Sequence, residues 1–120
     1  MKIEKIKSQM RKGVLEYCIL NLLNQKKAAY TSDILQELKQ AKMIVVEGTV
    51  YPLLTRLKNA GYLTYKWEES NAGPPRKYYY LTQDGRQLLG VMEQAWNELV
   101  NAVNFINKNN LQNKDNEKND

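Results

Sequence analysis

An apolar stripe near the carboxyl end of the chain limits the possible folds more than any other feature of the sequence. Its members recur three or four residues apart, as at the a and d positions of a coiled coil, and they are Leu89, Met92, Trp96, Leu99, Val103 and Ile106. At about 1.5 Å per residue the stripe is about 27 Å long, which is more than a small domain can cover. Packing within one chain could bury part of it, but the pattern favours a homodimer joined along two such helices.

Three shorter helices are predicted ahead of the stripe. The first runs from about Ile3 to Asn24, the second begins at a polar cap within residues 31–33, and the third runs from Glu47 to Ala60. A β-branched run from Met43 to Val46 predicts a short strand before the third helix. Gly61 then stops the third helix, because glycine readily takes the left-handed conformation that ends helices.

A β-hairpin is predicted directly after the third helix. Apolar residues alternate with polar ones from Leu63 to Trp67 and again from Arg76 to Leu81, which is the period of a half-buried strand. The intervening residues, Ser70 to Pro75, favour a turn. We therefore expect the hairpin to carry two positive charges, Arg76 and Lys77, at its tip end.

Three helices followed by a hairpin is the order of elements in a winged helix-turn-helix domain. The fold expected is mainly α with a small β-hairpin, and this domain occupies residues 1–82. Thr82 caps a long dimerisation helix, residues 83–108. The remaining residues, 109–120, are rich in Asn, Lys, Asp and Glu, a composition typical of a disordered polar tail.

The residue content excludes most enzymatic chemistry. The chain has no histidine and a single cysteine, Cys18, so it can build neither a Cys/His zinc site nor a Ser-His-Asp or Cys-His nucleophile. Its carboxylates show no catalytic pairing, and we expect no metal, no cofactor and no enzymatic activity. No apolar run approaches the roughly 18 to 20 residues of a membrane helix, and the basic amino terminus lacks a cleavage signal, so we expect a cytoplasmic protein.

Positive charge is concentrated in the first three quarters of the chain. Residues 1–90 hold 15 Lys or Arg against 8 Asp or Glu, a net +7, whereas residues 91–120 hold 3 against 5, a net −2. A basic face of this kind suits a polyanion such as nucleic acid, although many basic proteins bind none.

The third helix has the features of a DNA recognition helix. A helix fits the major groove when its core side is apolar and its other side carries short polar and basic residues. The apolar side here consists of Val50, Leu53, Leu54 and Leu57. The predicted DNA-binding residues are Thr31, Ser32, Thr49, Tyr51, Thr55, Arg56, Lys58, Arg76 and Lys77. Taken singly, each of these would also fit a solvated surface or, for Thr31 and Ser32, a plain helix cap.

Three motifs resemble the PadR family of bacterial transcriptional regulators. Residues 47–57 (EGTVYPLLTRL) resemble its recognition helix, residues 73–82 (GPPRKYYYLT) with Gly85 resemble its wing and the start of its last helix, and residues 11–16 with Leu22 and Leu23 resemble its first helix. The resemblance covers about residues 10 to 106. It implies a homodimer that binds double-stranded DNA at a palindromic operator, usually as a repressor released by a small molecule.

Two interpretations stay open for Trp96. Some PadR-like proteins bind flat hydrophobic compounds between tryptophans in the middle of the dimer seam, so the resemblance makes Trp96 a candidate site for a small planar hydrophobic effector. Alternatively, Trp96 is only part of the interface core. For the whole chain, the alternative to a DNA-binding regulator is a winged-helix module that binds other proteins without direct contact to DNA.

Overall fold

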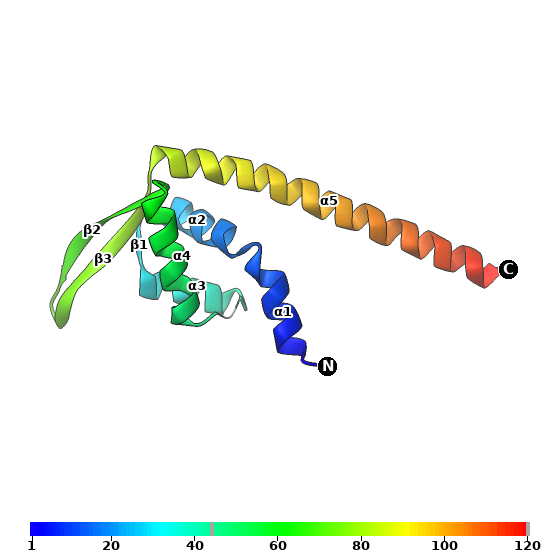
Figure 1. The fold of residues 1–120 in the computed structure, drawn as a ribbon, viewed down its shortest axis with the longest axis horizontal. Helices are drawn as coiled ribbons and strands as arrows, with labels where there is room; N and C mark the ends of the chain where they lie inside the picture. The colour runs from blue at the N-terminus through cyan, green and yellow to red at the C-terminus, as the bar shows by residue number, and fades with distance from the viewer. Residues whose placement is uncertain (44, 120) are drawn as a thin grey trace. The chain divides into compact units, whose positions relative to one another are not determined.

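The computed structural model describes residues 1–43 and 45–119, with side chains up to Leu111 apart from that of residue 44. The chain forms two compact units, Met1–Leu89, called the head below, and Gly90–Asp120, the C-terminal unit. Figure 1 shows the course of the chain through both units. Among the described residues, the head holds four helices, a sheet and the first residues of one further long helix, and the rest of that helix lies in the C-terminal unit.

Two helices stand where one was predicted at the amino terminus. These are α1 (Ile3–Lys12) and α2 (Leu15–Lys26). The helix breaks at Gly13 and Val14, because glycine has the most backbone freedom to lose in a helix interior. At the break the Val14 N–H donates to the Arg11 carbonyl oxygen at 3.0 Å, a tighter turn than that of an α-helix. The prediction of a single helix from Ile3 to Asn24 was therefore wrong.

The second and third predicted helices are present as α3 (Thr31–Gln40) and α4 (Glu47–Asn59). In the first turn of α3, the Asp33 carboxylate accepts a hydrogen bond from the Tyr30 backbone N–H at 3.0 Å. This bond closes the amino-terminal end of α3, where backbone N–H groups lack partners within the helix. Thr31, Ser32 and Asp33 were the predicted capping residues, and Asp33 is the one that makes this hydrogen bond.

The predicted strand from Met43 to Val46 is not formed by residues 43, 45 and 46, and Ile44 lies outside the described residues. The reason lies at the end of α3. The Met43 N–H donates to the Leu38 carbonyl oxygen at 2.8 Å, so this backbone group closes α3 instead of pairing in a sheet. Lys42 has a positive φ of 61°, which turns the chain away from an extended course.

The hairpin is part of a three-stranded antiparallel sheet. Strand β2 (Leu63–Ser70) pairs with β3 (Gly73–Leu81), and β3 also pairs with the short strand β1 (Ala29–Tyr30), in the order β1-β3-β2. The register places Tyr65 opposite Tyr79 and Ala29 opposite the same Tyr79. Sequence patterning predicted the hairpin but missed β1, since two residues are too few to show a period.

The core of the head is made where α2, α3, α4 and the base of the sheet meet. Its buried side chains are Leu15, Ile19, Leu20, Leu23, Ala29, Ile34, Leu38, Val50, Leu54, Leu57, Leu63, Tyr79, Leu81 and Leu89. Three of the four predicted inward residues of the third helix are among them, and the fourth, Leu53, is half-buried. Cys18 is also half-buried, and burial raises the pKa of its thiol, as expected of a cysteine that packs as a small apolar side chain.

Thr82 caps the last helix, α5 (Gln83–Asn119), as predicted. Its Oγ1 accepts a hydrogen bond from the Gly85 N–H at 3.0 Å, and its hydroxyl donates to the Gly61 carbonyl oxygen at 2.7 Å. The two bonds fasten the start of α5 to the end of α4. Gly61 has a φ of 87°, the left-handed conformation that glycine adopts without steric cost.

Helix α5 is longer than predicted. It was expected to end at Lys108 and to be followed by a disordered tail, residues 109–120, but the backbone stays helical to Asn119. No glycine or proline follows Gly90, so no residue type that breaks helices interrupts this stretch. Residue 120 lies outside the described residues. Among the helices described, none combines the length and the hydropathy that crossing a bilayer requires.

Candidate nucleic-acid interface

Helix α4 presents a polar face to solvent. Its buried residues, Val50, Leu54 and Leu57, lie on one side, so the rest of its surface faces outward. The α4 residues predicted to touch DNA are all exposed: Thr49, Tyr51, Thr55, Arg56 and Lys58. Pro52 is exposed as well, within the first two turns, and does not interrupt the helix. The apolar and polar sides thus divide as a groove-binding helix requires.

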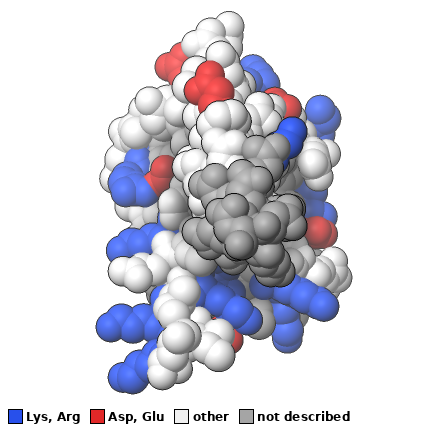
Figure 2. All heavy atoms as spheres, turned by 90° about the vertical axis from the view of Figure 1, so that its right-hand side faces the viewer, with Lys and Arg blue, Asp and Glu red and all other residues white. Residues whose placement is uncertain are grey.

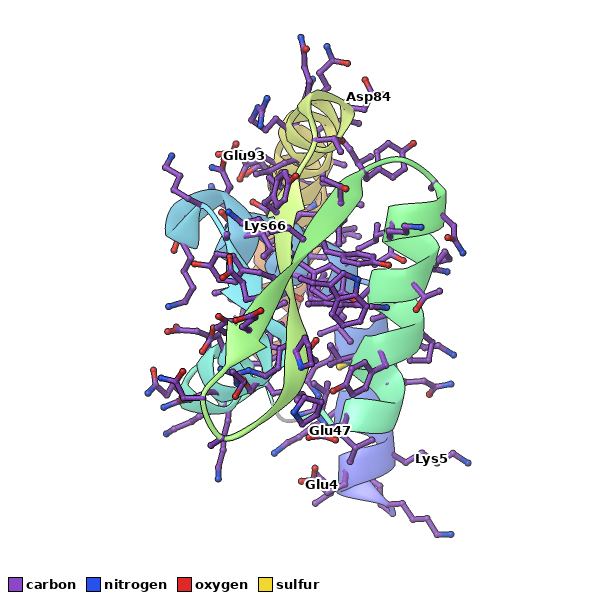
Figure 3. All side chains as sticks on the ribbon, turned by 90° about the vertical axis from the view of Figure 1, so that its left-hand side faces the viewer. Glu4, Lys5, Glu47, Lys66, Asp84 and Glu93 are labelled. Atoms are coloured by element: carbon purple, nitrogen blue, oxygen red, sulfur yellow. The ribbon has the colours of Figure 1, made fainter. Side chains whose placement is uncertain are left out.

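The start of α4 and the tip of the hairpin lie at the same end of the head (Figures 1 and 3). The hairpin leaves the far end of α4 and doubles back beside it, so that its tip comes level with Glu47, which is labelled in Figure 3. Figure 2 shows Lys and Arg side chains gathered in the lower part of its view, at the height that α1 occupies in Figure 1. One end of the head therefore combines a helix start, a hairpin tip and positive charge.

The two predicted wing cations lie within β3 and not at the tip of the hairpin. Arg76 pairs across the sheet with Glu68 and Lys77 with Trp67, whereas the turn is formed by Asn71 and Ala72. Successive residues of a strand point to opposite faces, so these two cations are on different sides of the hairpin. The alternation was visible in the sequence, and applying it would have separated Arg76 from Lys77.

Tyr79 joins the hairpin to the core. Its ring lies 5.6 Å from that of Tyr65, and it is buried among the helices at the base of the sheet. Burial raises the pKa of the Tyr79 phenol, and the nearby Tyr65 and Tyr51 add to this effect. The phenol therefore stays uncharged in its buried position at the base of the hairpin.

The start of α3 contributes one of its two predicted residues to the surface. Thr31 is buried at 9% exposure, whereas the neighbouring Ser32 is exposed. The Ser32 hydroxyl can therefore reach a phosphate at this helix start, and the Thr31 side chain faces the core instead. Sequence spacing alone could not separate the two, because both fit the first turn of a helix.

Arg56 forms an ion pair that the sequence did not reveal. Its guanidinium contacts the carboxylate of Glu16, so α4 is tied to α2. A hollow beside this pair is lined from α1 by Ser8, Arg11 and Lys12 and from α4 by Thr49, Leu53 and Arg56. Arg11 and Lys12 thus lie next to the recognition face although they are far from it in sequence. No local pattern could have indicated this proximity.

The fold agrees with the comparison to known proteins. A family model described as the transcriptional regulator PadR-like family matches residues 19–91. This chain belongs to that family. The PadR-like fold, winged helix with a long carboxyl-terminal helix, confirms the predicted fold class, and membership implies DNA-binding regulation of transcription. PadR-like proteins are regulators and generally not enzymes.

Solved structures of PadR-like proteins extend the similarity over most of the chain. A PadR-like transcription factor from Bacteroides fragilis is 62% identical, with 85% of this chain and 98% of that chain covered and a TM-score of 0.71. A PadR family regulator from Eggerthella lenta is 28% identical, with 87% and 90% covered and a TM-score of 0.79. A PadR-like regulator from Bacillus cereus is 35% identical, with 82% and 95% covered and a TM-score of 0.71.

The apolar stripe of this PadR-like chain is largely uncovered. Leu89 is buried in the head and Met92 is half-buried, whereas the other members are exposed: Trp96 (39%), Leu99 (54%), Val103 (47%) and Ile106 (58%). Phe105 is also exposed, on the opposite side of the helix from the stripe. Exposed apolar surface of this extent on one helix side is typical of an interaction site.

Proposed function

We propose that this PadR-like regulator is a homodimeric repressor of a palindromic operator, released by a small-molecule effector. The observation that carries the proposal is the exposed part of the stripe on α5, from Leu99 to Ile106. A second copy is the partner whose apolar residues match this spacing, because identical a and d positions interlock in a parallel or antiparallel helix pair. Two-fold symmetry then presents two copies of α4 to DNA.

In this proposal each head reads one half-site. Helix α4 enters the major groove with Thr49, Thr55 and Arg56 toward bases and phosphates, and the hairpin lies over the flanking minor groove. The two recognition helices of such a dimer are about 34 Å apart, one turn of DNA, which is why the operator is palindromic. Ser32, Tyr51, Lys58 and Lys77 complete the proposed surface.

Release requires an effector that prefers one arrangement of the two heads, because a ligand with equal affinity for both arrangements shifts nothing. Trp96 is the proposed effector site. It lies in the middle of the stripe, so pairing two stripes brings two indole rings close to the symmetry axis. A planar hydrophobic molecule fits between such rings by stacking.

The test combines assembly and DNA binding. We expect sedimentation equilibrium of the full chain at micromolar concentration to show a dimer, and fluorescence anisotropy to show binding to selected fragments of the source genome. Each phosphate neutralised contributes about −0.9 to the slope of log K against log salt, so about six contacts give a slope near −5. A monomer whose DNA affinity ignores salt would contradict the proposal and favour the protein-interaction module.

The Glu16–Arg56 ion pair yields a smaller prediction. Glu16→Gln is expected to raise affinity for duplex DNA about two- to fivefold, because an ion pair of this exposure is worth about 0.2–1 kcal/mol and Arg56 would no longer share its charge. The matched control is Glu37→Gln, which removes the same charge from a pair with Lys26 (3.0 Å). Equal gains in anisotropy titrations of both variants would mean that only net charge matters.

A further inference from the structure

The two faces of the hairpin differ in chemistry. Strand alternation and the register place Tyr65, Trp67 and Lys77 on the face that also carries the buried Tyr79 and packs toward α4. Lys66, labelled in Figure 3, lies on the opposite face with Tyr78 and Arg76. The hairpin is therefore two-sided, and only one side continues the surface of α4.

Four residues on the α4 side form one continuous group, called the aromatic–lysine cluster. The Lys77 ammonium lies 4.6 Å from the centre of the Tyr65 ring and 5.5 Å from that of Trp67. Tyr65 and Trp67 meet edge to face, 5.7 Å between centres. The Lys58 ammonium, from α4, lies 5.8 Å from the same Tyr65 ring. The cluster thus bridges recognition helix and hairpin.

The charges of the two faces are balanced differently. Lys66, on the far face, forms an ion pair with Glu68 at 3.7 Å, and Glu68 is also the cross-strand neighbour of Arg76. Within the described residues, neither Lys58 nor Lys77 pairs with a carboxylate. Positive charge on the α4 side is therefore available to an external anion, whereas on the far face part of it is neutralised.

Trp67 is the unusual member of the cluster, because its large apolar ring is 60% exposed at the outer part of the hairpin. Holding such a ring in water is unfavourable, and the fold does not need it there, since the last buried residue on this face is Tyr79, opposite the half-buried Tyr65. Two lysines over the Tyr65 ring, one of which also lies near the exposed Trp67 ring, match the edge of a duplex, where phosphates flank the apolar faces of the sugars.

We propose that the aromatic–lysine cluster is the part of the wing that binds duplex DNA, with Lys58 and Lys77 on backbone phosphates and the Trp67 ring against deoxyribose in the minor groove beside the half-site. Arg76 has a positioning role instead. Its guanidinium lies 4.0 Å above the Tyr30 ring, so it holds the hairpin to the start of α3. The inference rests on the proposed function, because it assumes that α4 reads DNA.

Two lysines of the hairpin provide a matched comparison. Both lie over an aromatic ring, Lys77 over Tyr65 and Lys66 over Tyr78 at 5.9 Å, but on opposite faces. Lys77→Gln is expected to weaken binding to all duplexes and to flatten the salt slope by about 0.9 for each head, the share of one phosphate contact. Lys66→Gln is expected to leave the slope unchanged. Titrations at several salt concentrations measure both.

Trp67 should show a different signature. Trp67→Ala is expected to weaken binding about tenfold with an unchanged salt slope, because the lost contact is apolar, and Trp67→Phe is expected to recover most of the affinity. Thermal unfolding of both variants checks the fold, which a ring this exposed supports little.

The outcomes separate this inference from the proposed function. If the unsubstituted protein binds no genomic duplex, the proposed function fails and the inference falls with it. If it binds, but Lys66→Gln and Lys77→Gln flatten the slope equally, or Trp67→Ala binds as tightly as the unsubstituted protein, the cluster is not the DNA contact. The proposed function as a DNA-binding regulator would then remain, without a contribution from the aromatic–lysine cluster.

Discussion

A protein carrying Leu99→Glu and Val103→Glu is expected to be monomeric at micromolar concentration and to bind its operator about a hundredfold more weakly than the unsubstituted protein. Both residues lie in the uncovered part of the stripe, and a carboxylate there must be buried without a partner when two helices pair. Once one head of a dimer is bound, the second head binds its half-site as an intramolecular step, which raises the overall affinity by about 10² to 10⁴ in two-site systems. Separate heads lose this gain in affinity. Sedimentation and anisotropy measure the two effects.

Phe105→Glu is the control for this pair of substitutions. Phe105 is 66% exposed and equally apolar, but it points away from the stripe, so the variant is expected to remain dimeric and to bind DNA normally. Circular dichroism should show an unchanged head in both proteins, because the substituted residues belong to the C-terminal unit. A dimeric Leu99→Glu, Val103→Glu protein would rule out the stripe as the seam.

Gly85→Ala is expected to destabilise the head by about 3 kcal/mol and to lower the melting temperature by at least about 10 °C. A Cβ at this position would overlap the backbone carbonyl oxygen of Tyr62, and backbone cannot rotate away as a side chain can. Alanine normally favours a helix over glycine by about 1 kcal/mol, but the overlap outweighs this gain. Relief requires the first turn of α5 to move, which breaks the 2.7 Å bond between Thr82 and Gly61.

Gly90→Ala tests the same substitution five positions further along α5. A Cβ at Gly90 would meet no atom within 4 Å, so only the helix preference remains. The variant is expected to keep or slightly raise the melting temperature, because alanine stabilises the helix by up to about 1 kcal/mol over glycine. Scanning calorimetry of the two variants isolates the effect of the contact with Tyr62. Equal melting temperatures would show that the first turn of α5 does not pack against the Tyr62 backbone.

The parts of the fold that local patterns encode were predictable. The amphipathic α4, the alternating strands of the hairpin, the Thr82 cap and the stripe on α5 each depend on residues within a few turns of one another. Such patterns report which side of an element is apolar, and burial within the head follows them.

Features that depend on distant residues were not predictable. Strand β1 exists only because Ala29 and Tyr30 find β3, some fifty residues later, as a hydrogen-bonding partner. The Glu16–Arg56 pair and the approach of Arg11 to α4 likewise join residues from separate helices. The burial of Thr31 depends on how α3 rotates against the sheet, which its own sequence does not state.

The shortness of β1 has an evolutionary consequence. Because β1 pairs only with Tyr78 and Tyr79, the outer ribbon from Trp67 to Lys77 has backbone hydrogen bonds to itself alone. Mutations, insertions or deletions in this ribbon can accumulate without disturbing the packed interior that keeps the molecule folded. With the backbone contacts proposed for this ribbon, duplicated genes can therefore change their affinity for DNA by substitutions in the ribbon, while the packed interior stays the same.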